Sequence, residues 1–136
     1  ILLQMTVVKP HEVLMEDGVL EEFNDTKGKA MFVSHQWRTK THPDPDGQQL
    51  RVLQDSLQNI LAGRSTISTE VVVEMLYGRV LVPTSDDLRA EPLFIWYDYF
   101  SCPQQLPTPG QAMATSPQAD AINSIPSYVA RSLYFI

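Results

Sequence analysis

The sequence predicts an α/β fold built on an open parallel sheet with flanking helices. Two apolar runs, at 30–33 and 93–97, lack the polar–apolar alternation of half-exposed strands, which is typical of parallel strands covered on both faces. A third apolar run begins at Leu133, and segments with helical patterns separate the three runs. Because parallel neighbours need long crossover connections, this order of elements favours a parallel sheet.

The composition agrees with one folded domain. The chain has 136 residues, of which 43% are hydrophobic, as in ordinary globular proteins. A net charge of -6, with ten scattered basic residues, argues against nucleic acid as a partner. A single cysteine, Cys102, excludes an intrachain disulfide and predicts a reducing, cytoplasmic location. We expect no membrane contact, since no apolar stretch reaches the ~18 residues of a membrane span and no signal segment is present.

Residues 1–28 are expected to form a helical lead-in. Pro10 can open a helix, and apolar residues follow it at helical spacing among acidic ones. Gly18 interrupts the pattern, so one helix and two short helices fit equally well. The turn-forming residues 24–28 then precede the first strand, which we place at 29–34.

The most regular helical pattern follows the loop at 42–47. Leucine and isoleucine recur on one face over 50–61, and Gly63 ends the pattern. Asp44 is the expected N-cap of this helix, with Pro45 as its first residue.

Residues 65–91 form an insertion with an ambiguous pattern. Three valines at 71–73 favour a strand, but the glutamate, methionine and leucine around them favour a helix closed at Gly78, which is the interpretation we adopt. A short extended piece is expected at 80–82.

The last part of the chain predicts a loop, a helix and a strand. Residues 103–117 are rich in proline, glutamine, serine and threonine, as in a long surface loop. A helix is expected over 119–132, which Pro126 either kinks or restarts. Because the sequence stops inside the apolar run 133–136, we expect the domain to be truncated at its C-terminus.

Polar side chains follow the first two strands where they end. Ser34 and His35 follow the first strand, and Asp98 follows the second. Ligands of open α/β sheets lie beyond the carboxyl ends of the strands, so these side chains face one another if the strands are neighbours. A carboxylate behind a buried run needs partners. Asp98 therefore either binds a ligand hydroxyl or cation, or anchors nearby backbone N–H groups.

The other candidate residues have two interpretations each. Ser34 and His35 point to opposite sides of an extended chain, so they are not a nucleophile–base pair. They either contact a ligand or pack locally. Trp37 can stack on a base, or anchor the core, and Arg38 can hold a phosphate. Cys102 is favoured as a plain buried thiol rather than a nucleophile.

No motif identifies a metal site or a catalytic residue. The spacing of the histidine and aspartates in 42–46 fits neither zinc patterns nor an EF-hand, so a helix cap is favoured there. The sequence contains no glycine-rich dinucleotide fingerprint, P-loop, nucleophile elbow or His-Glu-x-x-His motif.

The order of the motifs resembles the TIR-like domain family. Phe-Val-Ser-His at 32–35 is similar to the end of the family's first strand, and Trp-Tyr-Asp at 96–98 to the end of its second. Ala-Ile-Asn-Ser-Ile at 121–125 is similar to the helix that leads into its third strand. The fuller strings Phe-Val-Ser-His-Gln-Trp, His-Pro-Asp-Pro-Asp-Gly and Ser-Ile-Pro-Ser-Tyr-Val also resemble a group of uncharacterised microbial eukaryotic proteins.

The resemblance covers 29–136 and implies a flavodoxin-like, TIR-like signalling domain. Such domains self-associate, and some cleave NAD at the nicotinamide–ribose bond. It implies a nucleotide-sized cleft bounded by Ser34, His35, Arg38 and Asp98, with NAD as a substrate and no cofactor. In this cleft Arg38 would hold phosphate, Asp98 would orient a sugar hydroxyl and Trp37 would stack.

The resemblance leaves the reaction open. The family's catalytic glutamate lies on a helix after the third strand, beyond Ile136, so no catalytic residue is assigned. One alternative is a non-catalytic module for self-association or protein interaction, using the loop 103–117 and the helix faces. Another is a different small-molecule enzyme on a flavodoxin-like sheet, since fold does not determine function.

Overall fold

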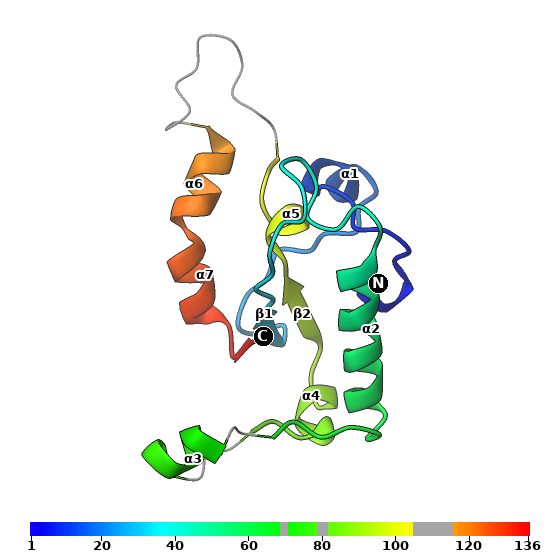
Figure 1. The fold of residues 1–136 in the computed structure, drawn as a ribbon. Coiled ribbons are helices and arrows are strands. Elements are labelled where there is room, and N and C mark those ends of the chain that lie inside the picture. The colour runs from blue at the N-terminus through cyan, green and yellow to red at the C-terminus, as the bar shows by residue number, and fades with distance from the viewer. Residues whose placement is uncertain (69–70, 79–81, 105–115) are drawn as a thin grey trace.

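Three parallel strands form the centre of the molecule in this computed structural model, which describes residues 1–68, 71–78, 82–104 and 116–136. The strands are β1 (Lys29–Phe32), β2 (Leu93–Trp96) and β3 (Tyr134–Phe135), in the order β2-β1-β3. Met31 of β1 lies opposite Ile95 of β2 and Tyr134 of β3. The predicted parallel α/β sheet is thereby confirmed (Figure 1).

The two long apolar runs differ in burial because of their places in the sheet. β1 is central, and Ala30, Met31 and Phe32 are buried. β2 lies at the edge of the described sheet, and its four residues are only half-buried. The expectation that both strands are covered on both faces is therefore right for β1 and wrong for β2.

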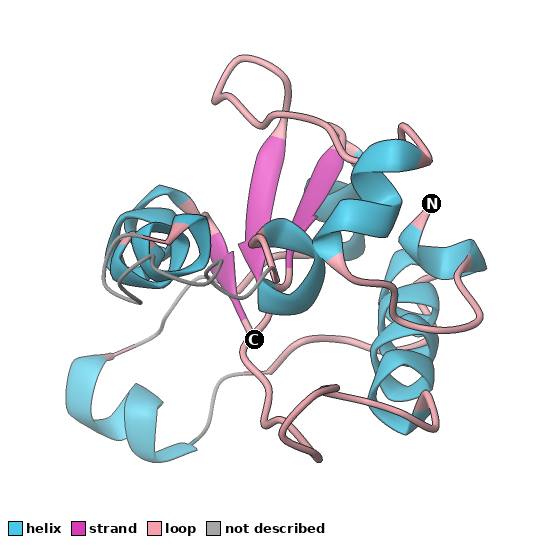
Figure 2. Cartoon of the chain, turned by 90° about the horizontal axis from the view of Figure 1, so that it is seen from above, coloured by secondary structure: helices cyan, strands magenta, loops and turns pink. Residues whose placement is uncertain are grey.

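Helices flank this sheet on two sides, as Figures 1 and 2 show. The helical elements are η1 (Leu2–Gln4), α1 (His11–Glu16), α2 (Gln48–Leu61), α3 (Val71–Tyr77), α4 (Ser85–Arg89), α5 (Asp98–Ser101), α6 (Pro117–Asn123) and α7 (Ile125–Arg131). α2 lies on one side of the strands, and α6 and α7 lie on the other. No helix among the described residues is long and apolar enough to cross a membrane.

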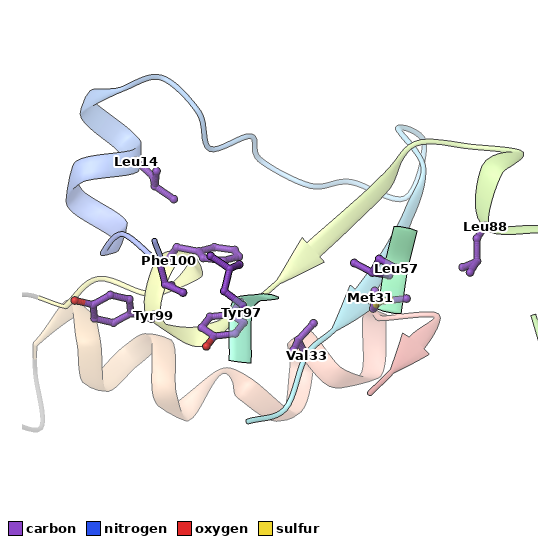
Figure 3. Packing of buried hydrophobic residues seen from close by; sticks show 10 residues of the cluster. Leu14, Met31, Val33, Leu57, Leu88, Tyr97, Tyr99 and Phe100 are labelled. Carbon is purple, nitrogen blue, oxygen red and sulfur yellow. The ribbon is translucent and has the colours of Figure 1, made fainter. Parts of the chain in front are cut away.

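The main hydrophobic core lies between the sheet and α2. Met31 and Val33 point to this side and pack in one cluster with Leu50 and Leu57 of α2. Figure 3 shows Met31 next to Leu57. The lead-in contributes as well, because Val8 and Leu14 belong to the same cluster.

The opposite face of β1 is held by aromatic stacking. The Phe32 ring stacks on Trp96 of β2 with centroids 4.3 Å apart and on Phe135 of β3 at 5.4 Å. Trp96 in turn contacts Tyr128 of α7 at 5.4 Å. One side chain of the central strand thus links all three strands, and Trp96 extends the contact to α7.

Most expected helices are present, with shifted ends. The lead-in contains one α-helix, α1, whose N-cap is Pro10, and Gly18 follows it with a φ of 65°. The helix expected before Gly78 is α3, and Pro126 lies in the first turn of α7, so it restarts the helix rather than kinking it. Pro117 opens α6 behind the N-cap Ser116, and so it is not part of the loop expected at 103–117.

The insertion contains one unexpected helix, and two expected segments lie partly outside the described residues. α4 was not expected; its N-terminus is stabilised by a capping box between Thr84 and Asp87. Residues 80–81 of the expected extended piece and 105–115 of the expected loop lie outside the described residues.

The expected start of α2 is wrong by three residues. The helix begins at Gln48, and its N-cap is Gly47, which has a left-handed φ of 67°. The Gly47 N–H donates to Asp44 O, so residues 44–47 form a turn before the helix. The Asp44 carboxylate nevertheless accepts the N–H of Leu50 at 2.8 Å, so it caps the first turn from further upstream.

Candidate functional site

Asp98 connects the ends of the two neighbouring strands. It follows β2 as the first residue of α5, and its Oδ1 lies 2.8 Å from Nε2 of His35, just beyond β1. Its Oδ2 accepts the indole N–H of Trp37 at 2.8 Å. We call His35, Trp37 and Asp98 the strand-end cluster. The sequence-based expectation that Asp98 faces the groups after the first strand is confirmed for His35, whereas the contact between Trp37 and Asp98 was not predicted.

His35 is neutral in this environment. Burial lowers its pKa from the ordinary value, while the charges of Asp98 and, less strongly, Asp44 act in the opposite direction. A neutral imidazole carries one proton, and a carboxylate only accepts, so the proton lies on Nε2 and is donated to Asp98. The ring is fixed by parallel stacking on Tyr97, with centroids 3.8 Å apart.

Trp37 is the exposed member of the cluster. Its side chain is 37% exposed, and its ring meets Tyr99 edge-on at 5.5 Å. The interpretation of Trp37 as a core anchor is therefore wrong. Its indole is held by one hydrogen bond and one aromatic contact, which leaves part of its surface free to stack on a ligand.

Asp98 retains capacity to bind a further donor. Its side chain is 32% exposed, and each of its carboxylate oxygens accepts one N–H, from His35 and from Trp37. A carboxylate offers about four acceptor positions, so a ligand hydroxyl can still be accommodated. Asp98 is therefore an anchor, although it holds two ring N–H groups rather than backbone N–H groups. It also keeps acceptor positions towards solvent, where a ligand can bind.

Arg38 and Ser34 lie beside the cluster without joining it. The Arg38 guanidinium pairs with Asp46, and it also donates to the Gln48 side chain at 3.3 Å. Desolvation raises the pKa of Asp46, but the Arg38 hydrogen bond and charge, together with backbone hydrogen bonds, bring it below its ordinary value. Ser34 is exposed, and its backbone N–H donates to Ile136 O. A phosphate that bound Arg38 would have to compete with Asp46.

A second polar group, around Asp44, was missed as part of the site. Asp44 is fully buried, and its backbone N–H donates to Nδ1 of His42 at 3.0 Å. His42 therefore carries its proton on Nε2, which donates to Val8 O at 3.2 Å. The sequence signal was present in the loop at 42–47, but helix capping alone was expected of it.

Three buried polar atoms occur on residues of these two groups and on Tyr97, which stacks on His35. Nδ1 of His35, Oδ1 of Asp44 and the hydroxyl of Tyr97 have no hydrogen-bond partner among the described residues. They share one electrostatic neighbourhood, since the charge of Asp44 acts on both His35 and Tyr97. Burial and the Asp44 and Asp98 charges raise the pKa of Tyr97, so its phenol stays protonated. The neighbourhood thus combines two acceptors, His35 Nδ1 and Asp44 Oδ1, with one donor, the Tyr97 hydroxyl.

Cys102 has no nucleophilic character. The side chain is 3% exposed, and burial, followed by the charge of Asp98, raises its pKa to about 11. A thiol of this kind is not a thiolate at neutral pH. The interpretation as a buried thiol therefore fits the structure.

A large cavity lies away from the strand-end cluster. It is an open groove of about 1090 Å³ beside β2, and none of the five candidate residues Ser34, His35, Trp37, Arg38 and Asp98 lines it. The nucleotide-sized cleft among those residues stays a prediction. Within the described ranges, no group of three or more histidine, cysteine or acidic side chains is placed to hold a metal ion.

Comparisons with known proteins add no family assignment. The chain matches no protein-family model, no curated protein and no solved structure. What it does can therefore be argued only from the residues and their geometry.

Proposed function

We propose that this chain is a TIR-like signalling domain that binds a nucleotide, with NAD as the candidate, at the strand-end cluster. One observation carries the proposal: Asp98 holds a partly exposed indole and a neutral imidazole together at the carboxyl edge of two adjacent parallel strands. Ligands of open α/β sheets bind at this edge. The resemblance of the strand-end motifs to TIR-like domains supports the same ligand class.

The chemistry of the cluster suits a nucleotide. The exposed face of Trp37 can stack on a base, and the outward acceptor positions of Asp98 can orient a ribose hydroxyl. Arg38 supplies a cation for phosphate once it leaves Asp46. In this proposal His35 and Tyr97 have a structural role: Tyr97 stacks on His35, and His35 fixes the position of Asp98.

Titration with NAD tests the proposal directly. The chain has two tryptophans, so Trp96→Phe leaves Trp37 as the only indole reporter. We expect NAD to quench Trp37 emission saturably, and Asp98→Ala to weaken binding by about tenfold, as for loss of one hydrogen bond to a charged group. Asp55→Ala, an exposed carboxylate on α2, is the matched control. Nicotinamide release in the same samples distinguishes binding from cleavage.

The binding proposal fails if NAD leaves Trp37 emission unchanged. It also fails if Asp98→Ala lowers the melting temperature but leaves affinity intact, because Asp98 is then only a structural anchor.

A self-association module is the second candidate, favoured by the exposed apolar side chains of α3. Val72, Met75 and Leu76 are 62%, 81% and 70% exposed. Clustered exposed apolar residues mark interaction surfaces. Sedimentation velocity should then show a concentration-dependent dimer that Met75→Glu with Leu76→Glu abolishes. Val52→Glu, at an equally exposed position on α2, should leave it intact. A monomer at all concentrations would contradict this candidate.

A further inference from the structure

The groove beside β2 runs along an open strand edge. All four residues of β2 line it, although their side chains alternate between the two faces of the sheet. A cavity that touches both faces of one strand must pass around its edge. Leu20, Phe23 and Tyr128 line the groove as well, and the Phe23 ring lies 5.4 Å from that of Phe94. The groove therefore has an apolar, aromatic lining.

Within the described residues, no hydrogen bond reaches the backbone groups on the outer edge of β2, beside this groove. The N–H of Lys29 donates to Pro92 O and that of Val33 to Trp96 O, both at 2.9 Å. Since backbone groups alternate in direction along a strand, those of Leu93 and Ile95 point away from β1. Within the described part of the chain, β1 is the only strand that pairs with β2.

The charges at the groove favour a basic partner. Glu21 and Glu22 line it, and neither carboxylate has an ion pair among the described residues. Of the lysine and arginine side chains that line it, Arg131 pairs with Asp25 at 3.2 Å, whereas Lys27 donates to the backbone carbonyl of Glu22 at 2.8 Å, a contact that does not neutralise its charge. The two glutamates still outnumber this one uncompensated cation, so the charge of these side chains is negative, in keeping with the net charge of -6.

We propose that this groove binds an extended, basic peptide segment of a partner protein, which adds to the sheet as a strand beside β2. Backbone hydrogen bonds to Leu93 and Ile95 would hold the segment in register, as in other cases of strand addition. Alternate side chains would enter the aromatic lining, and lysine or arginine would meet Glu21 and Glu22. This interaction is separate from the proposed nucleotide site, because the groove and the strand-end cluster share no residue.

Three synthetic peptides test the proposal by fluorescence anisotropy. The first is a nine-residue peptide of alternating valine and threonine with a lysine near each end. The second has glutamate in place of lysine, and the third is the basic peptide with methyl groups on alternate backbone nitrogens. We expect the basic peptide to bind saturably, the acidic one about tenfold more weakly from two lost or reversed ion pairs, and the methylated one not at all.

Protein variants locate the binding. Glu21→Lys with Glu22→Lys should reverse the preference between the basic and acidic peptides. The matched double reversal Asp55→Lys with Glu74→Lys, at exposed positions outside the groove, should preserve it. In a Trp37→Phe background the basic peptide should change the emission of Trp96, which lines the groove.

Three results would overturn the proposal. One is equal binding of the basic and acidic peptides, and another is undiminished binding of the methylated peptide. The third is sedimentation evidence that a second copy of this chain occupies the groove, so that peptide binds only by dissociating a dimer. None of these readouts involves NAD, so they succeed or fail independently of the nucleotide proposal.

Discussion

At the scale of single residues, His35 connects the stability of the fold to pH. It stacks on Tyr97, donates to Asp98 and stays neutral because burial disfavours its charged form. Its folded-state pKa lies below the ordinary value, so the unfolded chain binds the proton more readily. Stability from this residue is thus fully present above the unfolded pKa of about 6.5 and is lost as the pH falls below it towards the folded value.

We expect acidification from pH 7.5 to below 6 to lower the free energy of unfolding of the wild type more than that of His35→Gln. Glutamine cannot take up the proton, so the difference between the two curves isolates His35. Urea titrations at several pH values provide the measurement. Parallel curves for the two proteins would show that His35 titrates alike in the folded and unfolded states.

Gly28 is required by the close approach of two chain segments. A Cβ at this position would lie 2.2 Å from Pro92 O, the atom that accepts the Lys29 N–H at the start of the β1–β2 ladder. Gly28→Ala should therefore cost about 2 kcal/mol or more, since the ladder must shift. Gly63→Ala is the control, because it meets only the strain of a left-handed φ of 68° and should cost about 1 kcal/mol. Thermal melts compare the two; an equal loss would refute the steric argument.

At the scale of elements, Asp44 fixes the start of α2. Its carboxylate takes the otherwise unpaired N–H of Leu50, and the side chain is fully buried. Asp44→Ala should cost about 1–2 kcal/mol, as for loss of a helix cap, whereas Asp44→Asn keeps an acceptor oxygen and should cost less. Chemical denaturation distinguishes them. An asparagine variant as unstable as the alanine variant would mean that the charge, and not the cap, matters.

Local patterns predicted the elements better than their ends. The apolar face of α2 follows from spacing that the sequence displays, and Pro126 marked an interruption before α7 without showing whether the helix kinks or restarts there. The start of α2 was misplaced because Asp44 caps the helix across an intervening turn, and sequence spacing does not show that contact. The edge position of β2 was missed for a similar reason, because strand order is decided by tertiary pairing.

The candidate site was predicted in part. His35 and Asp98 could be brought together from the sequence because each follows the end of a parallel strand, whereas the hydrogen bond from Trp37 to Asp98 was not predicted. The contacts of Asp44 with His42 and Leu50, and the burial of the Tyr97 hydroxyl, could not be predicted, because they depend on how the loop 42–47 packs in the folded chain. Such contacts have no periodicity in the sequence.

At the scale of the whole molecule, the Phe32 side chain connects the three strands of the sheet. It is 6% exposed and stacks on Trp96 and Phe135 from the two neighbouring strands. Phe32→Ala should cost about 3–5 kcal/mol by opening a cavity between the three strands. Phe135→Ala removes the same kind of ring at a 61% exposed position and should cost less than about 1 kcal/mol. Denaturant unfolding of both variants is the measurement, and similar losses would contradict the central role of Phe32.

The central position of β1 also has a consequence for how the chain folds. Both of its neighbours come much later in the sequence, β2 at Leu93–Trp96 and β3 at Tyr134–Phe135. During synthesis β1 therefore leaves the ribosome before either strand that pairs with it among the described residues, whereas α2 can form from local contacts alone. The nascent chain thus carries an apolar strand without these two partners until residues 93–96 have followed. In the cell, protection by chaperones would matter most during that interval.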